Sequence, residues 1–333
     1  MIEGLIERLL RATQPLRAYR GRSIALERLL GASNSSAEFA SIQAACSVAG
    51  VPTGAWYHWR WVQTLLLLVF RHAPKAWVMR VVTHLDRTDY AAIAHAARAP
   101  GGLLLVTPHH GHFLLSIVAF ARHMARTRHV SLFYDAPQDN AGNAMFDALF
   151  RKLRDSDTRV AILHNNRAGI AGALKALRAG EIVVLMPDAY RRVEDTFQVP
   201  FHGRGRHTLL GMAVMARRTG ATLLPMISRA IDGSASFASC IGTPIAMPRP
   251  CGDAEADATR DLFADYATTV EVYRQFEQLM GNDLHYWQHC RTHFHGPPAL
   301  PVLTGDALAA AATLFLADPR LRVELTPVIS LDD

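Results

Sequence analysis

The sequence predicts an α/β fold in which a mostly parallel sheet carries helices on both faces. Short apolar runs recur between residues 103 and 227, and a stretch of helical character separates each run from the next. Continuous apolar strands that alternate with helices are typical of a parallel sheet buried on both faces. Half of the 333 residues are hydrophobic and 19% are charged, which is typical of a globular chain.

The predicted elements of this domain follow one another regularly. The strands are expected at Leu103–Thr107, Val130–Tyr134, Val160–Leu163, Ile182–Met186 and Thr222–Ile227. Helices are expected between them, at 113–126, 141–154, 168–179 and 208–219. In such sheets the ligand binds beyond the carboxyl ends of the strands, so the residues that follow each strand are the candidates for function.

The segments on either side complete three predicted regions: a helical region at 1–98, the α/β domain at 99–295 and an extension at 296–333. An amphipathic helix is expected over residues 2–10, with either an anionic membrane surface or the main domain as its partner. A second helix, from about residue 55 to 71, gathers aromatic side chains that suit a core, an acyl-chain groove or a membrane interface. The extension is expected to hold a linker at 296–301, a helix at about 304–317 and a strand-like run at 321–331. No apolar run reaches the ~20 residues that a membrane-spanning helix needs.

Charge and cysteine content exclude several classes of protein. The formal net charge is +6, carried mainly by arginine, which suits phosphate or carboxylate ligands but is equally explained by codon bias. The four scattered cysteines show neither zinc-ligand spacing nor a disulfide pattern, which agrees with a reducing cytoplasm. No motif combines aromatic and basic residues in the way of a nucleic-acid-binding fold, so no nucleic acid is expected as a partner.

The first candidate site follows the run at 103–107, where the sequence reads Thr-Pro-His109-His110-Gly111-His112. An imidazole at the end of a strand can take a proton from a hydroxyl or amine and so activate that group as a nucleophile. We therefore single out His109 and His112. Capping of the following helix is the alternative role for these histidines. A metal site is not expected, because no further ligand follows at a recognisable spacing.

The second candidate site follows the run at 182–186. Asp188 is well placed there to orient a histidine or to bind a substrate group. A Gly-Arg-Gly-Arg stretch with Arg204 and Arg206 precedes Thr208, the first residue of the helix expected at 208–219, and suits a phosphate or another anionic group. Arg167, between a strand and a helix, is a further candidate ligand for an acceptor phosphate or carboxylate. A solvated turn and an exposed arginine are the alternatives.

Three segments together resemble the late lipid A acyltransferases, within the lysophospholipid acyltransferase superfamily. They are LLLVTPHHGHFLLS, then GEIVVLMPDAYRRVEDTFQVPFHGRGRHTLLGMAVMARRTGATLLPM, then VEVYRQFEQLMGNDLHYWQHCRTHF. They follow one another in the family order, and the resemblance as a whole extends over about residues 50–295. The resemblance implies that the catalytic base is His109, because Gly111 matches the family's glycine two places later. It also implies acyl transfer from a carrier-protein thioester.

The resemblance breaks at the acidic partner of this histidine. In the family a carboxylate lies five residues after the histidine, and here that position is Leu114. Three explanations compete. Asp188 orients His109 in place of the missing carboxylate; or His109 works without one, its other nitrogen held by a backbone carbonyl or by His112; or catalysis is lost and the protein only binds acyl groups or carrier proteins. A carboxylate beside the imidazole fixes its tautomer and stabilises its charged form, so the difference affects the chemistry directly.

We therefore expect an enzyme that moves an acyl or peptidyl group from a carrier-protein or coenzyme A thioester to a hydroxyl or amine, without a cofactor. Backbone N–H groups near Gly111 are expected to stabilise the oxyanion. We expect no counterpart of the family's N-terminal membrane anchor, which favours a small, lipid or carrier-bound acceptor in a specialised-metabolite pathway. The expected location is the cytoplasm, with contact at the inner membrane face left open.

Overall fold

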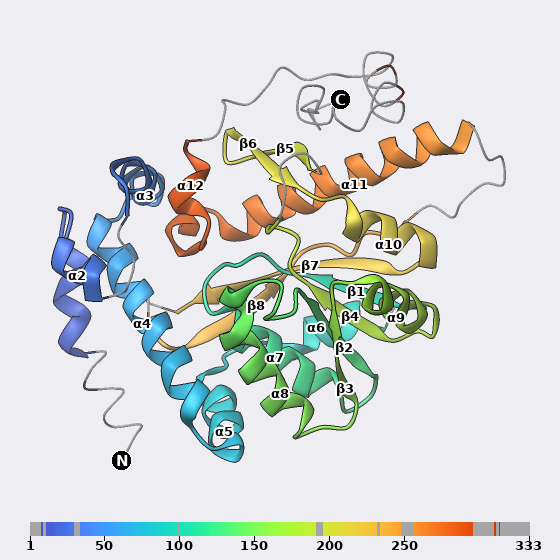
Figure 1. Ribbon diagram of the computed structural model, residues 1–333, viewed down its shortest axis with the longest axis horizontal. Coiled ribbons are helices and arrows are strands. Elements are labelled where there is room, and N and C mark those ends of the chain that lie inside the picture. Colours follow the sequence, from blue (N-terminus) through green and yellow to red (C-terminus); the bar gives the residue numbers. More distant parts are fainter. Residues whose placement is uncertain are drawn as a thin grey trace.

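A six-stranded sheet forms the centre of the protein (Figure 1). The structure, a computed structural model, describes residues 8, 11–29, 34–98, 100–190, 196–231, 234–247, 256–295, 310 and 313. The strand order is β3-β2-β4-β1-β7-β8, parallel except for the edge strand β8, which runs antiparallel to β7. The strands span β1 Leu103–Val106, β2 Val130–Tyr134, β3 Val160–His164, β4 Ile182–Leu185, β7 Thr222–Ala230 and β8 Phe237–Ile241. The mostly parallel α/β fold predicted from the sequence is confirmed, and β8 is the strand of this sheet that the sequence did not reveal.

Helices surround the sheet, and most begin or end at recognisable signals. Ser35 and Glu38 form a reciprocal capping box at the start of α3, and α10 ends at Gly220, which adopts φ +68°. The α-helices are α2 Ile24–Leu29, α3 Ser36–Val48, α4 Thr53–His72, α5 Lys75–Leu85, α6 Tyr90–Ala96, α7 Phe113–Met124, α8 Ala144–Arg154, α9 Arg167–Arg178, α10 Gly211–Thr219, α11 Ala256–Met280 and α12 Cys290–His293. Short 3-10 helices lie at Gln14–Ala18 (η1), Ala141–Asn143 (η2) and Asp283–Tyr286 (η4).

Alternate residues of each central strand face opposite cores, as the pleat of a strand requires. Leu103 and Leu105 of β1 pack with α5, α6, α7 and α8 in one core. Leu104 and Val106 pack with α9, α10 and α11 in the other. Figure 1 shows these two groups of helices on the two sides of the sheet. Both faces are therefore covered, which explains why the central strands read as unbroken apolar runs.

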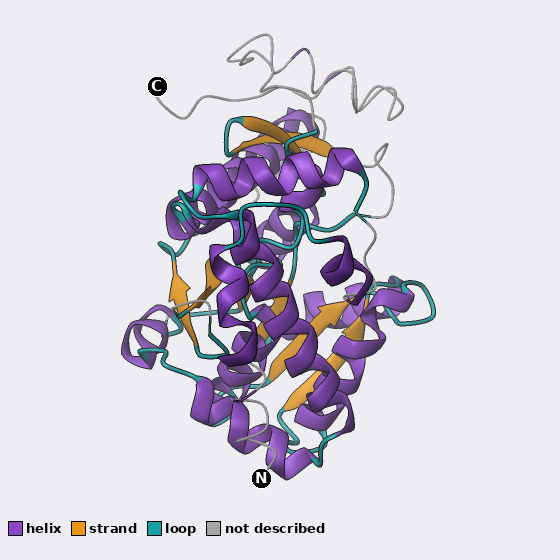
Figure 2. Ribbon diagram, turned by 90° about the vertical axis from the view of Figure 1, so that its left-hand side faces the viewer, coloured by secondary structure: helices purple, strands orange, loops and turns teal. Residues whose placement is uncertain are grey.

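A β-hairpin lies apart from the main sheet and beside α11 (Figure 2). β5 (Phe197–Phe201) pairs antiparallel with β6 (Arg204–Thr208) through a turn in which His202 adopts φ +45° and Gly203 φ +70°. The expectation of a flexible Gly-Arg-Gly-Arg loop in front of a helix that starts at Thr208 is wrong. Arg204, Arg206 and Thr208 belong to a strand because β6 pairs with β5 along its whole length, and the helix begins three residues later, at Gly211.

The aromatic residues of α4 belong to the core, except Trp61, which is half-buried. Trp56 and Trp59 are 2% and 0% exposed and pack with α3 and with the closing segment, which we define as residues 281–295 after α11. Among the described residues, no helix is long and apolar enough to cross a bilayer. The linker at 296–301 and the run at 321–331 lie outside the described residues, as do nearly all of residues 2–10 and 304–317. The limits at residues 98 and 296 remain predictions.

The connections that leave two neighbouring strands diverge at the centre of the sheet. β1 leads into α7, which packs on one face, whereas β4 leads through the hairpin into α10, which packs on the other. Adjacent strands whose connections leave on opposite faces form the topological switch point at which α/β sheets bind their ligands. The fold therefore directs attention to the carboxyl ends of β1 and β4.

Candidate active site

His109 and Asp188 lie side by side because the register of β1 and β4 brings the ends of these strands together. Val106 pairs with Leu185, and His109 follows the first of these by as many residues as Asp188 follows the second. His109 Nδ1 lies 2.7 Å from Asp188 Oδ1. The two side chains are only 9% and 1% exposed. A histidine and a carboxylate far apart in the chain thus form a buried pair at the switch point.

Three N–H groups fix the orientation of the Asp188 carboxylate. In addition to the contact with His109 Nδ1, Oδ2 accepts the backbone N–H of His109 at 2.9 Å and the indole N–H of Trp287 at 2.8 Å. The guanidinium of Arg206 donates to the backbone carbonyl of Asp188 and lies over the Trp287 ring, with 4.8 Å from Cζ to the ring centroid. Arg206 therefore stabilises the backbone of Asp188 and the ring of Trp287, and it is not among the described residues that line the cavity beside His109.

The charge of Asp188 determines which nitrogen of His109 carries the proton. Burial opposes ionisation, but the attraction and hydrogen bond of His109 outweigh it and hold the pKa of Asp188 well below its usual range. An ionised carboxylate only accepts hydrogen bonds, so Nδ1 of His109 must be the protonated nitrogen. Nε2 is then left as a base. This arrangement can remove a proton from a bound hydroxyl or amine and stabilise the resulting imidazolium.

A cavity of about 370 Å³ adjoins His109. Its volume lies in the range of ligand-binding pockets. Much of its wall is apolar, from Phe133, Phe146, Ile170, Leu185, Met186, Leu209, Met212 and Met215. Polar side chains gather in the same wall, from Asp135, Asn140, Asn143, Asn165, Tyr190, Gln288 and His289. The cavity thus combines a large apolar surface with a limited set of polar groups beside a base.

The other two histidines of the first motif have structural contacts. His110 lies between two carbonyl oxygens, with Nδ1 2.9 Å from that of Ser228 and Nε2 3.0 Å from that of Asp283. His112 is 3% exposed, and its Nε2 lies 2.8 Å from the carbonyl oxygen of Ser234. The interpretation of His112 as a partner of His109 is therefore not supported by its position: it ties the start of α7 to the loop before β8.

Gly111 is required by the backbone, but its N–H is not available to a substrate. It adopts φ +57°, and a Cβ atom at this position would lie 2.1 Å from the carbonyl oxygen of Ser228. Its N–H donates to the carbonyl of Tyr286 at 2.9 Å. Of the N–H groups near Gly111 that are expected to stabilise an oxyanion, that of Gly111 itself is therefore already used, in a hydrogen bond that joins the loop after β1 to the closing segment.

The remaining predicted ligands do not converge on the cavity. Thr208 is buried, donating from its hydroxyl to the carbonyl of Pro187 at 3.1 Å and accepting from Tyr273 at 3.0 Å. Arg204 is half-buried in β6. Arg167 is exposed at the start of α9. None of these three residues is among the described residues that line the cavity beside His109. Instead of binding a ligand, Thr208 is hydrogen-bonded to the backbone of Pro187, the residue directly before Asp188.

The His109–Asp188 pair and His289 together form a group of three potential metal ligands. Donor atoms of these residues all lie within 4.8 Å of one another. Both oxygens of the Asp188 carboxylate already accept hydrogen bonds from N–H groups. A cation at this point would displace the proton of His109 Nδ1. The donor set therefore fits a hydrogen-bonded pair of residues better than a metal centre.

The buried histidines make stability depend on pH. Burial lowers the pKa of His112 and His202 to about 4 and that of His285 and His293 to about 3. Below an ordinary value of 6.5 the unfolded chain binds protons that these folded sites do not. We expect the free energy of unfolding to fall as pH drops from 7 to 5, by up to about 1.4 kcal/mol per pH unit for each histidine. Urea denaturation at pH 7, 6 and 5 measures this, and His112→Gln should reduce the slope. Equal midpoints at pH 7 and 5 would contradict the expectation.

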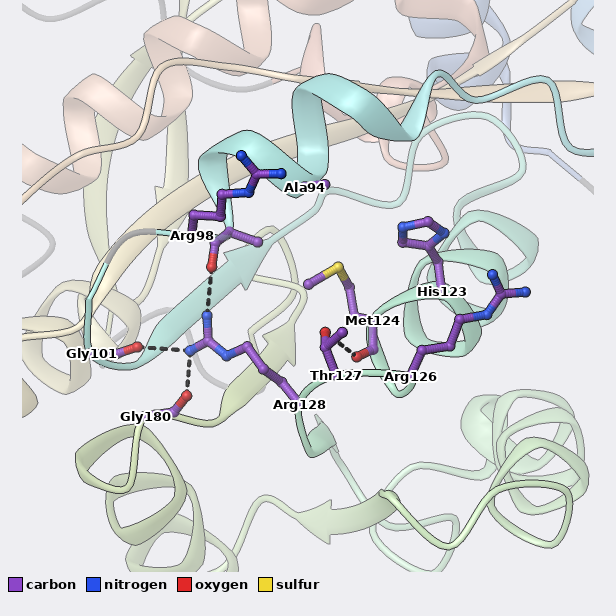
Figure 3. A pocket seen from close by; sticks show the side chains of 10 residues that line it. Ala94, Arg98, Gly101, His123, Met124, Arg126, Thr127, Arg128 and Gly180 are labelled. Carbon is purple, nitrogen blue, oxygen red and sulfur yellow. Dashed lines mark hydrogen bonds between the residues drawn. The ribbon is translucent and has the colours of Figure 1, made fainter.

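A second cavity, of about 580 Å³, lies at the opposite edge of the sheet, where β1, β2 and β4 begin. Figure 3 shows the Arg128 guanidinium between the carbonyls of Gly101 and Gly180, to which it donates, in addition to that of Ala97. The described residues that line this second cavity include no carboxylate, so the cavity lacks an acid–base pair of the His109–Asp188 type. Arg128 here holds together the loops that precede three strands.

Sequence reasoning did not single out Trp287 or His289. Both lie about a hundred residues after Asp188 in the chain, and the backbone bond from the N–H of Gln288 to the carbonyl of His109, at 2.8 Å, brings them to the pair. Both residues lie in the third of the segments that resemble the acyltransferases, but nothing in that segment linked them to His109 or Asp188.

Comparison with known protein families finds a match for this chain. A family model described as bacterial lipid A biosynthesis acyltransferase matches residues 59–259, which is more than half of the chain and includes both His109 and Asp188. Among curated proteins the comparison finds no match.

Proposed function

Because the chain belongs to the bacterial lipid A biosynthesis acyltransferase family, we propose that it transfers an acyl group from a thioester to a hydroxyl or amine, with His109 as general base. The family consists of acyltransferases that depend on acyl carrier protein. The observation that carries the proposal is the 2.7 Å contact between His109 Nδ1 and Asp188 Oδ1 beside a largely apolar cavity. The donor is a carrier-protein or coenzyme A thioester, and the acyl group is a fatty acyl or a peptidyl group.

The reaction proceeds in two proton transfers. Nε2 of His109 takes the proton of the acceptor as its oxygen or nitrogen attacks the thioester carbonyl, so that the new C–O or C–N bond forms. The tetrahedral intermediate then collapses and the C–S bond breaks. The imidazolium returns its proton to the departing thiolate, which leaves as a thiol. Asp188 keeps the imidazole in the required tautomer and stabilises its charge between the two steps.

The walls of the cavity suit the two substrates differently: the apolar part suits the acyl chain of the donor and the polar part suits the acceptor. Phe146, Met212 and Met215 offer apolar surface that an acyl chain can cover, and burial of such a chain contributes about 0.8 kcal/mol per methylene. The polar side chains near Asp135 suit the acceptor. Peripheral membrane contact and a cytoplasmic location remain part of the proposal.

Intact-protein mass spectrometry tests the proposed function. The full chain is incubated with carrier proteins loaded with fatty acyl or peptidyl groups, or with the matching coenzyme A thioesters, and with a panel of amines and alcohols. We expect the carrier to lose the mass of its acyl group and a product of donor acyl plus acceptor to appear. If no thioester is consumed while acylated carrier still binds, the protein is an acyl- or carrier-binding homologue instead.

A further inference from the structure

A second imidazole borders the cavity beside His109. The centroids of the His109 and His289 rings lie 5.2 Å apart, with the ring planes at 78°. Both residues line the cavity. The backbone on either side of His289 is anchored, by the bond from Gln288 N–H to the His109 carbonyl at 2.8 Å and by that from Cys290 N–H to Trp287 at 3.1 Å. The position of the second ring is therefore as well defined as that of the first.

The same carboxylate faces both rings. Nε2 of His289 is buried, has no hydrogen-bond partner among the described residues and lies 4.0 Å from Asp188 Oδ2. A negative charge at this distance favours the tautomer that carries its proton on Nε2. The ring is also neutral, because burial lowers the pKa of His289 further than the attraction of Asp188 raises it. Its other nitrogen, Nδ1, is then an acceptor.

The accessible part of the second ring belongs to the cavity. The His289 side chain is 28% exposed although Nε2 is buried, so the exposed part is the rest of the ring, which carries Nδ1. The cavity is thus bordered by two hydrogen-bond acceptors on adjacent imidazoles, Nε2 of His109 and Nδ1 of His289.

Building on the proposed function, we propose that the acyl acceptor is a primary amine and that His289 is the residue that selects it. The nitrogen of a primary amine carries two hydrogens, so it can donate one to His109 Nε2 and the other to His289 Nδ1. As the nitrogen attacks and becomes positively charged, both hydrogen bonds strengthen. A hydroxyl has a single hydrogen, and once this is donated to His109 its oxygen presents only lone pairs to His289. The second imidazole therefore binds an amine and disfavours an alcohol.

Matched acceptors test the inference. Each pair consists of a primary amine and the alcohol with the same carbon skeleton, supplied with one acylated carrier protein to the wild type, His289→Phe and His289→Gln. Phenylalanine keeps a ring of similar width but cannot accept a hydrogen bond. Glutamine can turn its amide NH₂ toward an oxygen. His295→Phe, at an exposed position in the same segment, is the control.

The wild type is expected to prefer the amine in kcat/KM. In His289→Phe the amine-to-alcohol ratio should fall by about 10- to 100-fold, the effect of losing one hydrogen bond to a group that becomes charged. In His289→Gln the rate with the alcohol should recover relative to that with the amine, and in His295→Phe the ratio should not change. Thermal unfolding of each variant shows whether it folds.

Two results would overturn the inference while the proposed function stands. One is a wild-type enzyme that acylates the alcohols faster than the amines. The other is a ratio that stays within twofold of the wild-type value in both His289 variants. If the wild type consumes no thioester with either acceptor, the proposed function itself fails, and the inference with it.

Discussion

Replacing His109 with alanine is expected to lower kcat about 10²- to 10⁴-fold, the range contributed by a positioned general base. Without the imidazole no described side chain that borders the cavity is hydrogen-bonded to Asp188, since Nε2 of His289 lies 4.0 Å from Oδ2. The fold should survive, because Asp188 keeps the hydrogen bonds from the His109 backbone N–H and from Trp287. The initial rate of thioester consumption measures the change, and the thermal midpoint shows whether the variant folds.

A histidine elsewhere provides the control for this variant. His95 is exposed on α6 and lies outside the described lining of the cavity. His95→Ala should therefore leave kcat unchanged. If His109→Ala folds and keeps kcat within threefold of the wild type, His109 is not the base.

Replacing Asp188 with asparagine should cost roughly 10³- to 10⁴-fold in kcat, because it reverses the tautomer of His109. Asparagine presents an NH₂ group where three N–H groups now meet a carboxylate, so at least one donor faces another donor. The favoured ring then carries its proton on Nε2 and cannot act as the base. Asp155→Asn, in an exposed ion pair with Arg154, is a matched control that should retain activity.

The same variant should also lose stability in a pH-dependent way. The pKa of Asp188 is lowered by folding, so its contribution to stability is present above the ordinary aspartate value of about 3.9 and is lost as pH falls through the lowered value. Asp188→Asn should therefore have a lower free energy of unfolding than the wild type at pH 7, and the difference should shrink below about pH 4.

Unchanged kcat in a folded Asp188→Asn enzyme would favour the explanation in which His109 works without a carboxylate.

The main sheet could be predicted from sequence because its signal is local. The runs around Leu104, Val184 and Leu224 are continuous and apolar since these strands are buried on both faces. β5 and β6 lack such a run, because a two-stranded hairpin with Arg204 and Arg206 in one strand reads as a basic turn. The edge strand β8 was missed for a similar reason: it is only partly buried and mixes polar with apolar residues.

The site was predictable only where a strand end marks it. His109 and Asp188 each follow a predicted strand, and one of the three competing explanations already joined them; the register of β1 and β4 supports that explanation. Trp287 and His289 follow no predicted strand, and they reach the pair through long-range backbone contacts that no sequence spacing reveals. Gly111 was singled out through the family resemblance and not for its backbone conformation, and the hydrogen bond from its N–H to the Tyr286 carbonyl could not be predicted because it is also long-range.

The most direct test of the account is a single-turnover reaction with enzyme in excess over acylated carrier protein, in which both proteins are followed by intact mass. Direct transfer through the His109–Asp188 pair predicts that the carrier loses its acyl group when an acceptor is present, that the mass of the enzyme never rises by the mass of an acyl group, and that His109→Ala and Asp188→Asn both stop the reaction. An acyl group appearing on the enzyme, or transfer that continues in both variants, would contradict it.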